Sequence, residues 1–261
     1  MLTQEAINLD SHLKQFEKDG YTAVEGALSD AELETLRTAF DAVIEREKEL
    51  GPRRGWHNDQ YVATYNMAQK SKAFWPLLEH PLFNAWMKRS LGENFVVSQF
   101  NAHGMKPGGV DQDLHIDQDE STPGVTACVQ GLFTLDDFTI ETGCTRLIPG
   151  SHKRAWSYAE YRKHRADFES ETIRVEAPAG SFVSWHGGII HGGSANRTAK
   201  PRRCITMFCI RPWIRVHCDY TRSMSPDVIG ALNENQKRRL GFFATPAWYN
   251  YTTDERIPAK S

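Results

Sequence analysis

The 261-residue sequence lacks the features that mark several large classes of protein. Lys and Arg number 31 against 33 Asp and Glu, so the net charge of −2 gives no overall field for nucleic acid or an anionic membrane. No apolar run approaches the length of a membrane span, and "MLTQEAINLD" lacks the basic and apolar regions of a secretory signal. We therefore expect a cytoplasmic protein whose partner is a small molecule, with no nucleic acid or membrane partner.

Cysteines are also few. The five present are odd in number, show no Cys-x-x-Cys spacing and stand mostly in apolar surroundings, which indicates reduced core thiols. The sequence has no internal repeats or low-complexity tracts, and no adenine- or pyrophosphate-binding motif supports coenzyme A as a ligand. The length suits one domain over residues 1–261, as a monomer or a homodimer.

The first 94 residues have mainly the pattern of helices, and we expect them to form a helical flank and a lid. A short strand is expected in "DGYTAVEG", between two helices. The second helix has Ser29 as its N-cap, with Glu32 three residues on as in a capping box. Residues 51–61 are expected to form a turn-rich loop. Helix returns over residues 74–91, with Pro81 in the first turn of its second part.

From Phe95 onward the pattern changes to short β-like runs separated by Gly, Pro, Asn and Asp turns. These runs are "FVVSQFNAH", "GVTACVQGLFTL", "TRLIPG", "ETIRVEA", "GSFVSWHG" and "RRCITMFCIRPW". Helices followed by many short strands predict a mostly β fold with flanking helices, with a sandwich or jelly roll over residues 95–216. A helix from Ser225 or Pro226 to about Leu240 and an aromatic tail are expected within residues 217–261.

The segment "DLHIDQD" at residues 113–119 concentrates polar groups. In an extended strand the side chains at i and i+2 share a face, so His115 and Asp117 would stand about 6–7 Å apart on one side. An imidazole beside a carboxylate supplies two of the three protein ligands of a mononuclear iron site. A polar edge strand or a solvated turn explains the same tripeptide, because isolated His-x-Asp sequences are common.

A third ligand has several candidates downstream, namely His152, His164, His186, His191 and His217. His186 and His191 lie in "SWHGGIIHGG", an apolar run with glycines, where a strand end can approach a metal closely. Taken alone, each of these two histidines is as consistent with a core or surface residue as with a ligand.

Four segments, in order, carry a resemblance to a known family. They are "FEKDGYTAVEGALSDAELETLRTAF", "LHID", "ETGCTRLIPGSHK" and "HGGSANRTAKPRR". Together they resemble the phytanoyl-CoA dioxygenase-like (PhyH) family of iron(II)- and 2-oxoglutarate-dependent oxygenases, over about residues 16–211. The resemblance implies a double-stranded β-helix, which is a cupin-like jelly roll, with Fe(II), 2-oxoglutarate and O2 as cofactor and co-substrates.

The resemblance also implies site residues. His115, Asp117 and His191 match the family's iron ligands. Arg202, eleven residues after the distal histidine, matches the arginine that binds the distal carboxylate of 2-oxoglutarate. A planar guanidinium suits that carboxylate because it offers two parallel donors and a fixed charge.

Two departures from the family pattern concern the surroundings of the expected site. Thr142 replaces the usual Asn of an Asn-Gly turn, which leaves the metal ligands untouched. Gly193 stands where some relatives have a serine, with Ser194 next to it, so a hydroxyl contact from Ser194 to the cofactor is left open.

Strand alternation bears on the choice between the adjacent arginines Arg202 and Arg203, since neighbours on a strand face opposite ways. Arg202 shares its face with a mixed set of residues suited to a site, Cys204, Thr206 and Phe208. Arg203 shares its face with residues suited to packing against a helical layer, Ile205, Met207 and Cys209. The alternation thus favours Arg202 for the interior of the barrel.

Six further residues are candidates around the cofactor and the substrate. We expect Gln99, Asn101 and Thr145 to contact the cofactor, although ordinary strand amides and hydroxyls explain them equally well. Gln130 is a candidate for the substrate on the same terms. Trp56 and Arg54 precede the barrel in a loop that could act as a lid, or they pack there.

The resulting prediction is a non-haem dioxygenase that hydroxylates a small molecule in secondary metabolism and releases succinate and CO2. Desaturation or cyclisation are alternative outcomes of the same chemistry. Halogenation is not expected, because the halogenating relatives give up the carboxylate ligand that Asp117 supplies here. The alternative in another class is a non-catalytic, cupin-like protein that binds a metal or a 2-oxo acid as a sensor. The complete triad and Arg202 argue against it.

Overall fold

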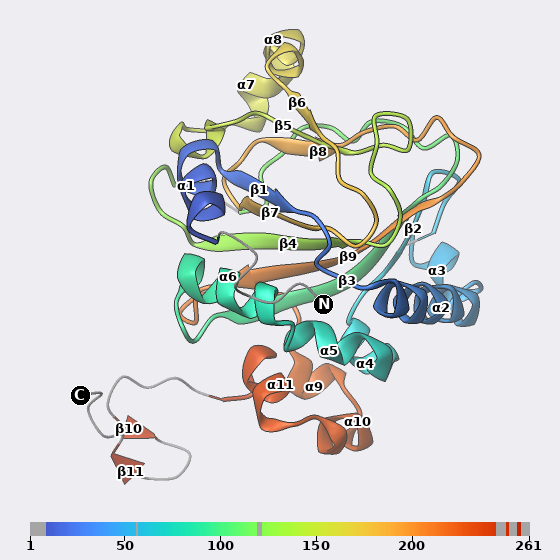
Figure 1. Ribbon diagram of the computed structural model, residues 1–261, viewed down its shortest axis with the longest axis vertical. Coiled ribbons are helices and arrows are strands. Elements are labelled where there is room, and N and C mark those ends of the chain that lie inside the picture. Colours follow the sequence, from blue (N-terminus) through green and yellow to red (C-terminus); the bar gives the residue numbers. More distant parts are fainter. Residues whose placement is uncertain (1–8, 56, 119–121, 244–248, 251–254, 257–261) are drawn as a thin grey trace.

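The computed structural model describes residues 9–55, 57–118, 122–243, 249–250 and 255–256 (Figure 1). Its strands are β1 (Tyr21–Val24), β2 (Tyr61–Thr64), β3 (Val96–Met105), β4 (Cys128–Thr134), β5 (Thr145–Leu147), β6 (Ile173–Val175), β7 (Phe182–His186), β8 (His191–Gly193), β9 (Arg202–Ile210), β10 (Tyr249–Asn250) and β11 (Glu255–Arg256). Its helices are α1 (Leu9–Asp19), α2 (Asp30–Arg46), α3 (Leu50–Arg53), α4 (Met67–Lys70), η1 (Lys72–Phe74), α5 (Trp75–Leu78), α6 (Pro81–Leu91), η2 (Ser151–Lys153), α7 (Tyr158–Lys163), α8 (Arg165–Ser170), α9 (Tyr220–Ser223), α10 (Pro226–Ala231) and α11 (Glu234–Arg239).

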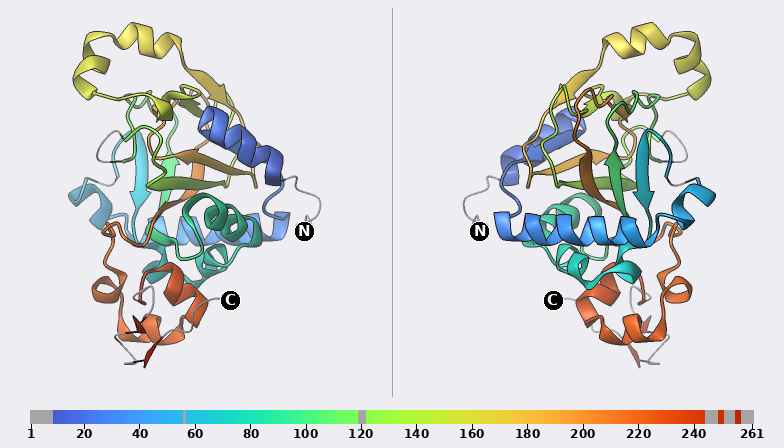
Figure 2. Two further views of the ribbon diagram at one scale, coloured as in Figure 1. Left: turned by 90° about the vertical axis from the view of Figure 1, so that its left-hand side faces the viewer. Right: turned by 90° about the vertical axis from the view of Figure 1, so that its right-hand side faces the viewer.

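Two antiparallel sheets face each other and form the predicted jelly roll. The large sheet has the order β1-β7-β4-β9-β3-β2, and the small sheet has the order β6-β5-β8. Helices α2, α5 and α6 lie on the side of the large sheet that faces away from the small one (Figure 1). The pair α7 and α8 lies at one end of the molecule, and α9–α11 lie at the other (Figure 2).

The two faces of the large sheet differ in composition because successive side chains alternate along each strand. On β9, Ile205, Met207 and Cys209 join the core formed with α1, α2 and α6. The intervening residues face the small sheet, where Cys204 packs in a second cluster with Leu132 of β4 and other residues. The alternation expected for β9 is therefore observed.

Local signals explain the helix starts. Ser29 caps α2 in the expected capping box, because its backbone N–H donates to Glu32 (2.8 Å) and its hydroxyl accepts from the Glu32 backbone. Pro81 takes the first turn of α6, where its missing N–H leaves no helical hydrogen bond unmade. These two predictions are confirmed.

Other expectations differ from the structure. The last part of the expected loop over residues 51–61 runs into β2, an edge strand paired with β3, and its first part forms α3. The expected C-terminal helix is two helices, because Asn233 starts α11 with its own capping box and interrupts the run after α10. Within the described parts of the chain, no helix is long and apolar enough to cross a membrane.

Candidate metal centre and its cavity

Three side chains converge at one end of the space between the sheets. Ligand atoms of His115, Asp117 and His191 all lie within 4.8 Å of one another. Nε2 of His115 lies 3.8 Å from Oδ1 of Asp117, and Nε2 of His191 lies 3.6 Å from Oδ2 of the same carboxylate. The two imidazole rings are 4.4 Å apart between centroids.

The backbone brings these residues together by one short antiparallel bridge and not by a regular strand. His115 and His191 exchange two backbone hydrogen bonds, each 2.9 Å, at the start of β8. The backbone N–H of Asp117 donates to Gly187 O at 2.8 Å, just before the turn into β8. His115 and Asp117 thus share a side, although the strand assumed for them is only a bridge.

Hydrogen bonds orient both imidazoles toward the common point. Nδ1 of His115 lies 3.0 Å from Asp113 O, and Nδ1 of His191 lies 3.1 Å from Ile189 O. An Nδ1–H that donates to a carbonyl leaves Nε2 with its lone pair, which is the form that binds a metal. Burial also lowers the pKa of His191 to about 4, although Asp117 acts in the opposite direction, so this imidazole is neutral at pH 7. Two neutral imidazoles and one carboxylate fit Fe(II).

Trp185 on β7 supports the carboxylate of the triad. Its indole Nε1–H donates to Asp117 Oδ2 at 2.9 Å, and its ring lies 5.0 Å from that of His191. A hydrogen bond from a neighbouring group to a ligand carboxylate fixes its orientation. No motif in the sequence marks Trp185 as a site residue.

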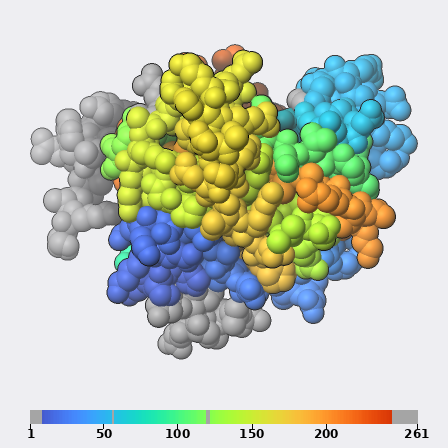
Figure 3. All heavy atoms as spheres, turned by 90° about the horizontal axis from the view of Figure 1, so that it is seen from above, coloured from blue at the N-terminus to red at the C-terminus, as the bar shows by residue number. Residues whose placement is uncertain are grey.

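The segment before His115 is held by α7 and α8, which cover the middle of the face seen in Figure 3. The Tyr161 hydroxyl accepts from Leu114 N (3.3 Å) and donates to Glu169 (3.1 Å). The buried Arg146 guanidinium donates both to Glu169 and to the backbone O of Gln112. This Tyr161–Glu169–Arg146 network ties the small sheet and α7–α8 to the segment that carries His115.

The same segment has further contacts with α7 and α8. Asp113 pairs with Arg165 (2.9 Å) and accepts a hydrogen bond from the Tyr158 hydroxyl at 3.2 Å. Asp113 therefore belongs to the support of the segment.

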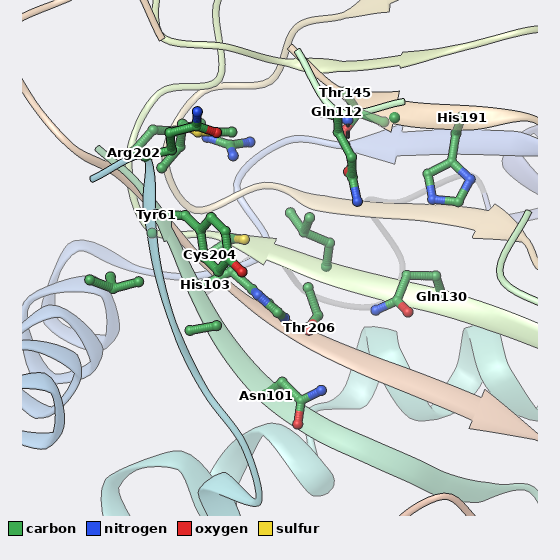
Figure 4. Close-up of a pocket in the computed structure, with 18 of the residues that line it drawn as sticks. Tyr61, Asn101, His103, Gln112, Gln130, Thr145, His191, Arg202, Cys204 and Thr206 are labelled. Carbon is green, nitrogen blue, oxygen red and sulfur yellow. Dashed lines mark hydrogen bonds between the residues drawn. The ribbon is translucent and has the colours of Figure 1, made fainter. Parts of the chain in front are cut away.

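A cavity of about 520 Å³ opens beside the triad, between the two sheets (Figure 4). Its lining includes Gln60, Tyr61, Tyr65, Gln99, Asn101, His103, Asp111, Gln112, Asp117, Gln130, Thr145, Trp185, His191, Arg202, Cys204 and Thr206. Arg202 and Cys204 lie at the side of the cavity opposite His191 and Gln130 (Figure 4). This size is within the range of small-molecule sites, roughly 300–1,000 Å³.

Arg202 is a buried cation that faces this cavity. It is 8% exposed, its guanidinium carbon lies 4.2 Å from the centroid of the Phe138 ring, and its Nε has no hydrogen-bond partner. No carboxylate within the described ranges forms an ion pair with it, and burial lowers its pKa. A buried guanidinium without a carboxylate partner is costly unless an anion binds there.

The adjacent Arg203 contrasts with Arg202. Its guanidinium donates to both oxygens of Asp136 (2.9 and 3.0 Å) and to Asp41 of α2 (2.8 Å). The hydrogen bonds to Asp136 raise its pKa. Arg203 is therefore fully engaged on the helical side of the sheet.

The other residues expected at the site are distributed as follows. Gln99, Asn101, Thr145 and Gln130 all line the cavity. Arg54 is an exposed residue that does not line it, and Trp56 falls outside the described residues. The lid role of these two residues remains a prediction.

Two residues whose roles the sequence left open lie away from the triad. His186 lies on the other face of β7 and packs against His152, with 5.0 Å between ring centroids. Ser194 is buried, is bonded to Arg174 and does not line the cavity. Neither His186 nor Ser194 therefore points into the space beside the triad.

Sequence reasoning missed Tyr61, Tyr65 and His103 in the cavity wall. His103 had a usable signal, because it continues the every-second-residue series of Gln99 and Asn101 on β3. Burial, followed by the charge of Arg202, lowers the pKa of His103 to about 4. The two tyrosines lie in or beside the segment expected to be a loop, where no strand alternation is expected.

A jelly roll with two imidazoles and one carboxylate, across a cavity from a buried arginine, is typical of the class of mononuclear non-haem iron oxygenases. The model of the family "Phytanoyl-CoA dioxygenase (PhyH)" matches residues 16–204, and the chain belongs to this family. The family, the fold and the triad agree with the expected Fe(II)/2-oxoglutarate-dependent dioxygenase, with Fe(II), 2-oxoglutarate and O2 as cofactor and co-substrates.

Individual relatives are distant but cover most of the chain. The chain is similar to "Dioxygenase ALT11" of Alternaria alternata, with 24% identity over 90% of this chain and 82% of the relative. It is also similar to "Fe(II)/2-oxoglutarate-dependent dioxygenase nvfF" of Aspergillus novofumigatus, with 25% identity over 87% of this chain and 80% of the relative.

Among solved structures, the fold is similar to that of the non-haem α-ketoglutarate-dependent carbocyclase SnoK from nogalamycin biosynthesis. The TM-score is 0.66 and the identity 21%, over 81% of this chain and 85% of SnoK. AviO1 from Streptomyces viridochromogenes Tue57 has a TM-score of 0.65 and 19% identity, over 79% of this chain and 96% of AviO1.

Proposed function

We propose that this protein oxidises an unactivated carbon of a small molecule, as a hydroxylase or with desaturation or cyclisation as the outcome, and releases succinate and CO2. His115, Asp117 and His191 would hold Fe(II). Bound iron and 2-oxoglutarate supply oxidative decarboxylation and the oxidant that attacks the C–H bond. The task of the chain is then to bind and orient both organic substrates and to limit water at the site.

Each group at the site has a separate part in this proposal. Arg202 would bind the distal carboxylate of 2-oxoglutarate and so fix its direction in the cavity. Trp185 holds the Asp117 carboxylate in place through its indole N–H. Gln130 and Thr145, from the two facing sheets, line the same cavity as Arg202 and the triad, where they would position the co-substrate or the substrate.

The single observation that carries the proposal is the buried Arg202 facing the same cavity as the triad. An iron site alone would also serve a sensor or a storage protein. A buried guanidinium without a carboxylate partner, across a cavity from a metal site, fits a ligand with a carboxylate at its far end and a metal-binding group at the other. 2-Oxoglutarate has this form.

The test is turnover by purified protein given Fe(II), ascorbate and 2-oxoglutarate. We expect succinate in amounts exceeding the protein concentration, and its loss in Asp117→Ala. A protein that binds 2-oxoglutarate without forming succinate, with or without candidate substrates, would support the sensor alternative instead.

A further inference from the structure

The charge of the cavity lining indicates which substrates can enter. Neutral amide and phenol groups dominate the polar part of the lining, namely Gln60, Gln99, Asn101, Gln112, Gln130, Tyr61 and Tyr65. Among the lining residues that the structure describes, Arg202 is the sole Lys or Arg. His103 adds no charge at pH 7, since its pKa is about 4.

The next step rests on the proposed function, because it assigns Arg202 to 2-oxoglutarate. Once that arginine is occupied, no other Lys or Arg among the described lining residues offers a positive charge to a second ligand. The charge of a metal held by the triad would be offset by Asp117 and by the bound 2-oxoglutarate. Asp111, a lining residue, adds a negative charge. An anionic group entering here would lose its hydration without gaining a counter-ion, and it would be repelled by Asp111.

Two tyrosines give the cavity wall an aromatic surface. Tyr61 and Tyr65 are each 38% exposed although they line the cavity, and they sit at the start and just past the end of edge strand β2. The Tyr61 hydroxyl donates to Gly55 O at 3.3 Å, which restrains its ring. The Tyr65 ring stands edge-on to His103, 6.2 Å away between centroids.

Such rings favour a flat, ring-containing ligand, because aromatic faces combine a large apolar area with little conformational freedom to lose. The amide groups add donors and acceptors for hydroxyl or carbonyl groups. The Gln112 side chain reaches into the cavity from the side of the small sheet, facing Gln130 and Asn101 on the large sheet (Figure 4).

We propose that the substrate is an uncharged, ring-containing molecule with hydroxyl or carbonyl groups, and that the part of it entering the cavity carries no carboxylate, phosphate or sulfate. Exclusion of anions is the specificity device, because the one Lys or Arg among the described lining residues, Arg202, is occupied by the co-substrate. A nucleotide-bearing thioester could not place its phosphates within this space.

A matched pair of fluorescent probes tests this inference without knowledge of the substrate. N-phenyl-1-naphthylamine is neutral, and 8-anilinonaphthalene-1-sulfonate has the same rings with one sulfonate. Each is titrated into the protein loaded with Zn(II) and 2-oxoglutarate. We expect the neutral probe to bind at least about tenfold more tightly. Tyr61→Ala and Tyr65→Ala should each weaken it several-fold, whereas Trp213→Ala, at an exposed aromatic residue outside the cavity, should not.

Two further experiments test whether the charge inside the cavity causes the difference in affinity between the two probes. Gln112→Arg should raise the affinity of the sulfonate probe about tenfold and leave that of the neutral probe nearly unchanged, with Gln112→Leu as the matched control. Without 2-oxoglutarate, the sulfonate probe should bind the wild-type protein more tightly than it does in the presence of 2-oxoglutarate. Arg202→Ala should abolish this increase in affinity.

The inference is overturned if the sulfonate probe binds the loaded wild-type protein as tightly as the neutral one with the same dependence on Tyr61. It is also overturned if neither tyrosine variant affects the neutral probe. Failure of the proposed function is seen separately, as the absence of an absorption band when 2-oxoglutarate is added to the anaerobic Fe(II) protein.

Discussion

The two faces of the large sheet use the same strands for opposite purposes. On the helical side, Arg203 is bonded to Asp136 and Asp41, and its neighbours pack in the core. On the side facing the small sheet, Arg202 has no carboxylate partner within the described residues, and polar side chains line a cavity. The difference teaches that the face whose charged groups are paired within the protein stabilises the fold. The face that leaves a charged group without a carboxylate partner among those residues is suited to binding a ligand.

Two pairs of histidines make the same contrast. His115 and His191 share Asp117, and each directs Nδ1 to a carbonyl. His186 and His152 also lie close together, but His186 Nδ1 accepts from Gly188 N (2.9 Å), and they are not part of a metal-ligating group among the described residues. Proximity of two imidazoles is therefore insufficient for a metal site; a third donor completes it.

The largest expected difference between the faces is in metal binding. His191→Ala removes a ligand and should weaken binding of Mn(II) or anaerobic Fe(II) by more than the roughly 10–100-fold typical of losing a supporting residue. His186→Ala should leave the affinity within a factor of about three and lower the free energy of unfolding instead. Calorimetric titration of both variants compares them. Loss of metal binding in His186→Ala alone would reverse the assignment of the third ligand.

The next difference concerns the two arginines. Arg202→Ala should weaken 2-oxoglutarate binding roughly 30-fold or more, because losing one partner of a partly buried charge pair costs about 2–5 kcal/mol. Arg203→Ala should leave that affinity nearly intact and reduce stability. The titration follows the absorption band of the anaerobic Fe(II) protein on adding 2-oxoglutarate. An unchanged affinity in Arg202→Ala would refute its assignment.

A matched pair of tryptophans gives a smaller effect. Trp185→Phe removes the indole N–H that donates to Asp117, and we expect about tenfold weaker metal binding. Trp86→Phe removes a similar bond on the helical side, where Nε1 donates to Ser184 Oγ at 2.9 Å, and should lower only stability. Metal titration and urea unfolding of both variants separate the two roles. Equal metal affinities in the two variants would show that the Trp185 bond does not orient Asp117.

The remaining difference is a pH dependence of stability on the helical side. Burial, followed by the charge of His152, lowers the pKa of His186 from 6.5 to about 4. The unfolded chain therefore binds this proton between about pH 6.5 and 4 while the folded chain does not. The contribution of His186 to the free energy of unfolding is fully present above pH 6.5. It is lost as the pH falls toward 4, with a slope of up to about 1.4 kcal/mol per pH unit.

Urea unfolding of the metal-free protein from pH 7 to 4.5 measures that slope. His186→Gln should reduce the slope of the free energy of unfolding against pH by up to the contribution of one proton, about 1.4 kcal/mol per pH unit. His103 and His191, whose pKa values are lowered in the same way, continue to contribute in both proteins. Identical slopes in the two proteins would show that His186 does not titrate in this way.

Short-range patterns predicted much of this molecule. The apolar runs from Phe95 onward gave the strands, and alternation on β9 separated Arg202 from Arg203. The family resemblance supplied the distal histidine, which spacing alone had left open. For the strands and the two arginines the information lies within a few residues of the feature, whereas the resemblance draws on four segments in order along the chain.

What could not be predicted depends on contacts between distant segments. Tyr61 lines the cavity because β2 pairs with β3, and a four-residue edge strand has too short a pattern to distinguish from a loop. His115 faces His191 through a single bridge to β8, so no strand pattern was present to find. The support from Tyr161 and Arg146 joins residues that only the folded chain brings together.

The Tyr161–Glu169–Arg146 network has a consequence for the lifetime of the protein. Because α7 and α8 hold the segment before His115, a metal that fixes His115 must in turn stabilise α7 and α8, since coupling between two sites is reciprocal. These short helices carry exposed basic residues such as Arg162 and Lys163, which are sites for trypsin-like proteases. We expect metal-depleted protein to be cleaved first at α7–α8, so iron supply would set how fast the chain is degraded as well as how fast it works.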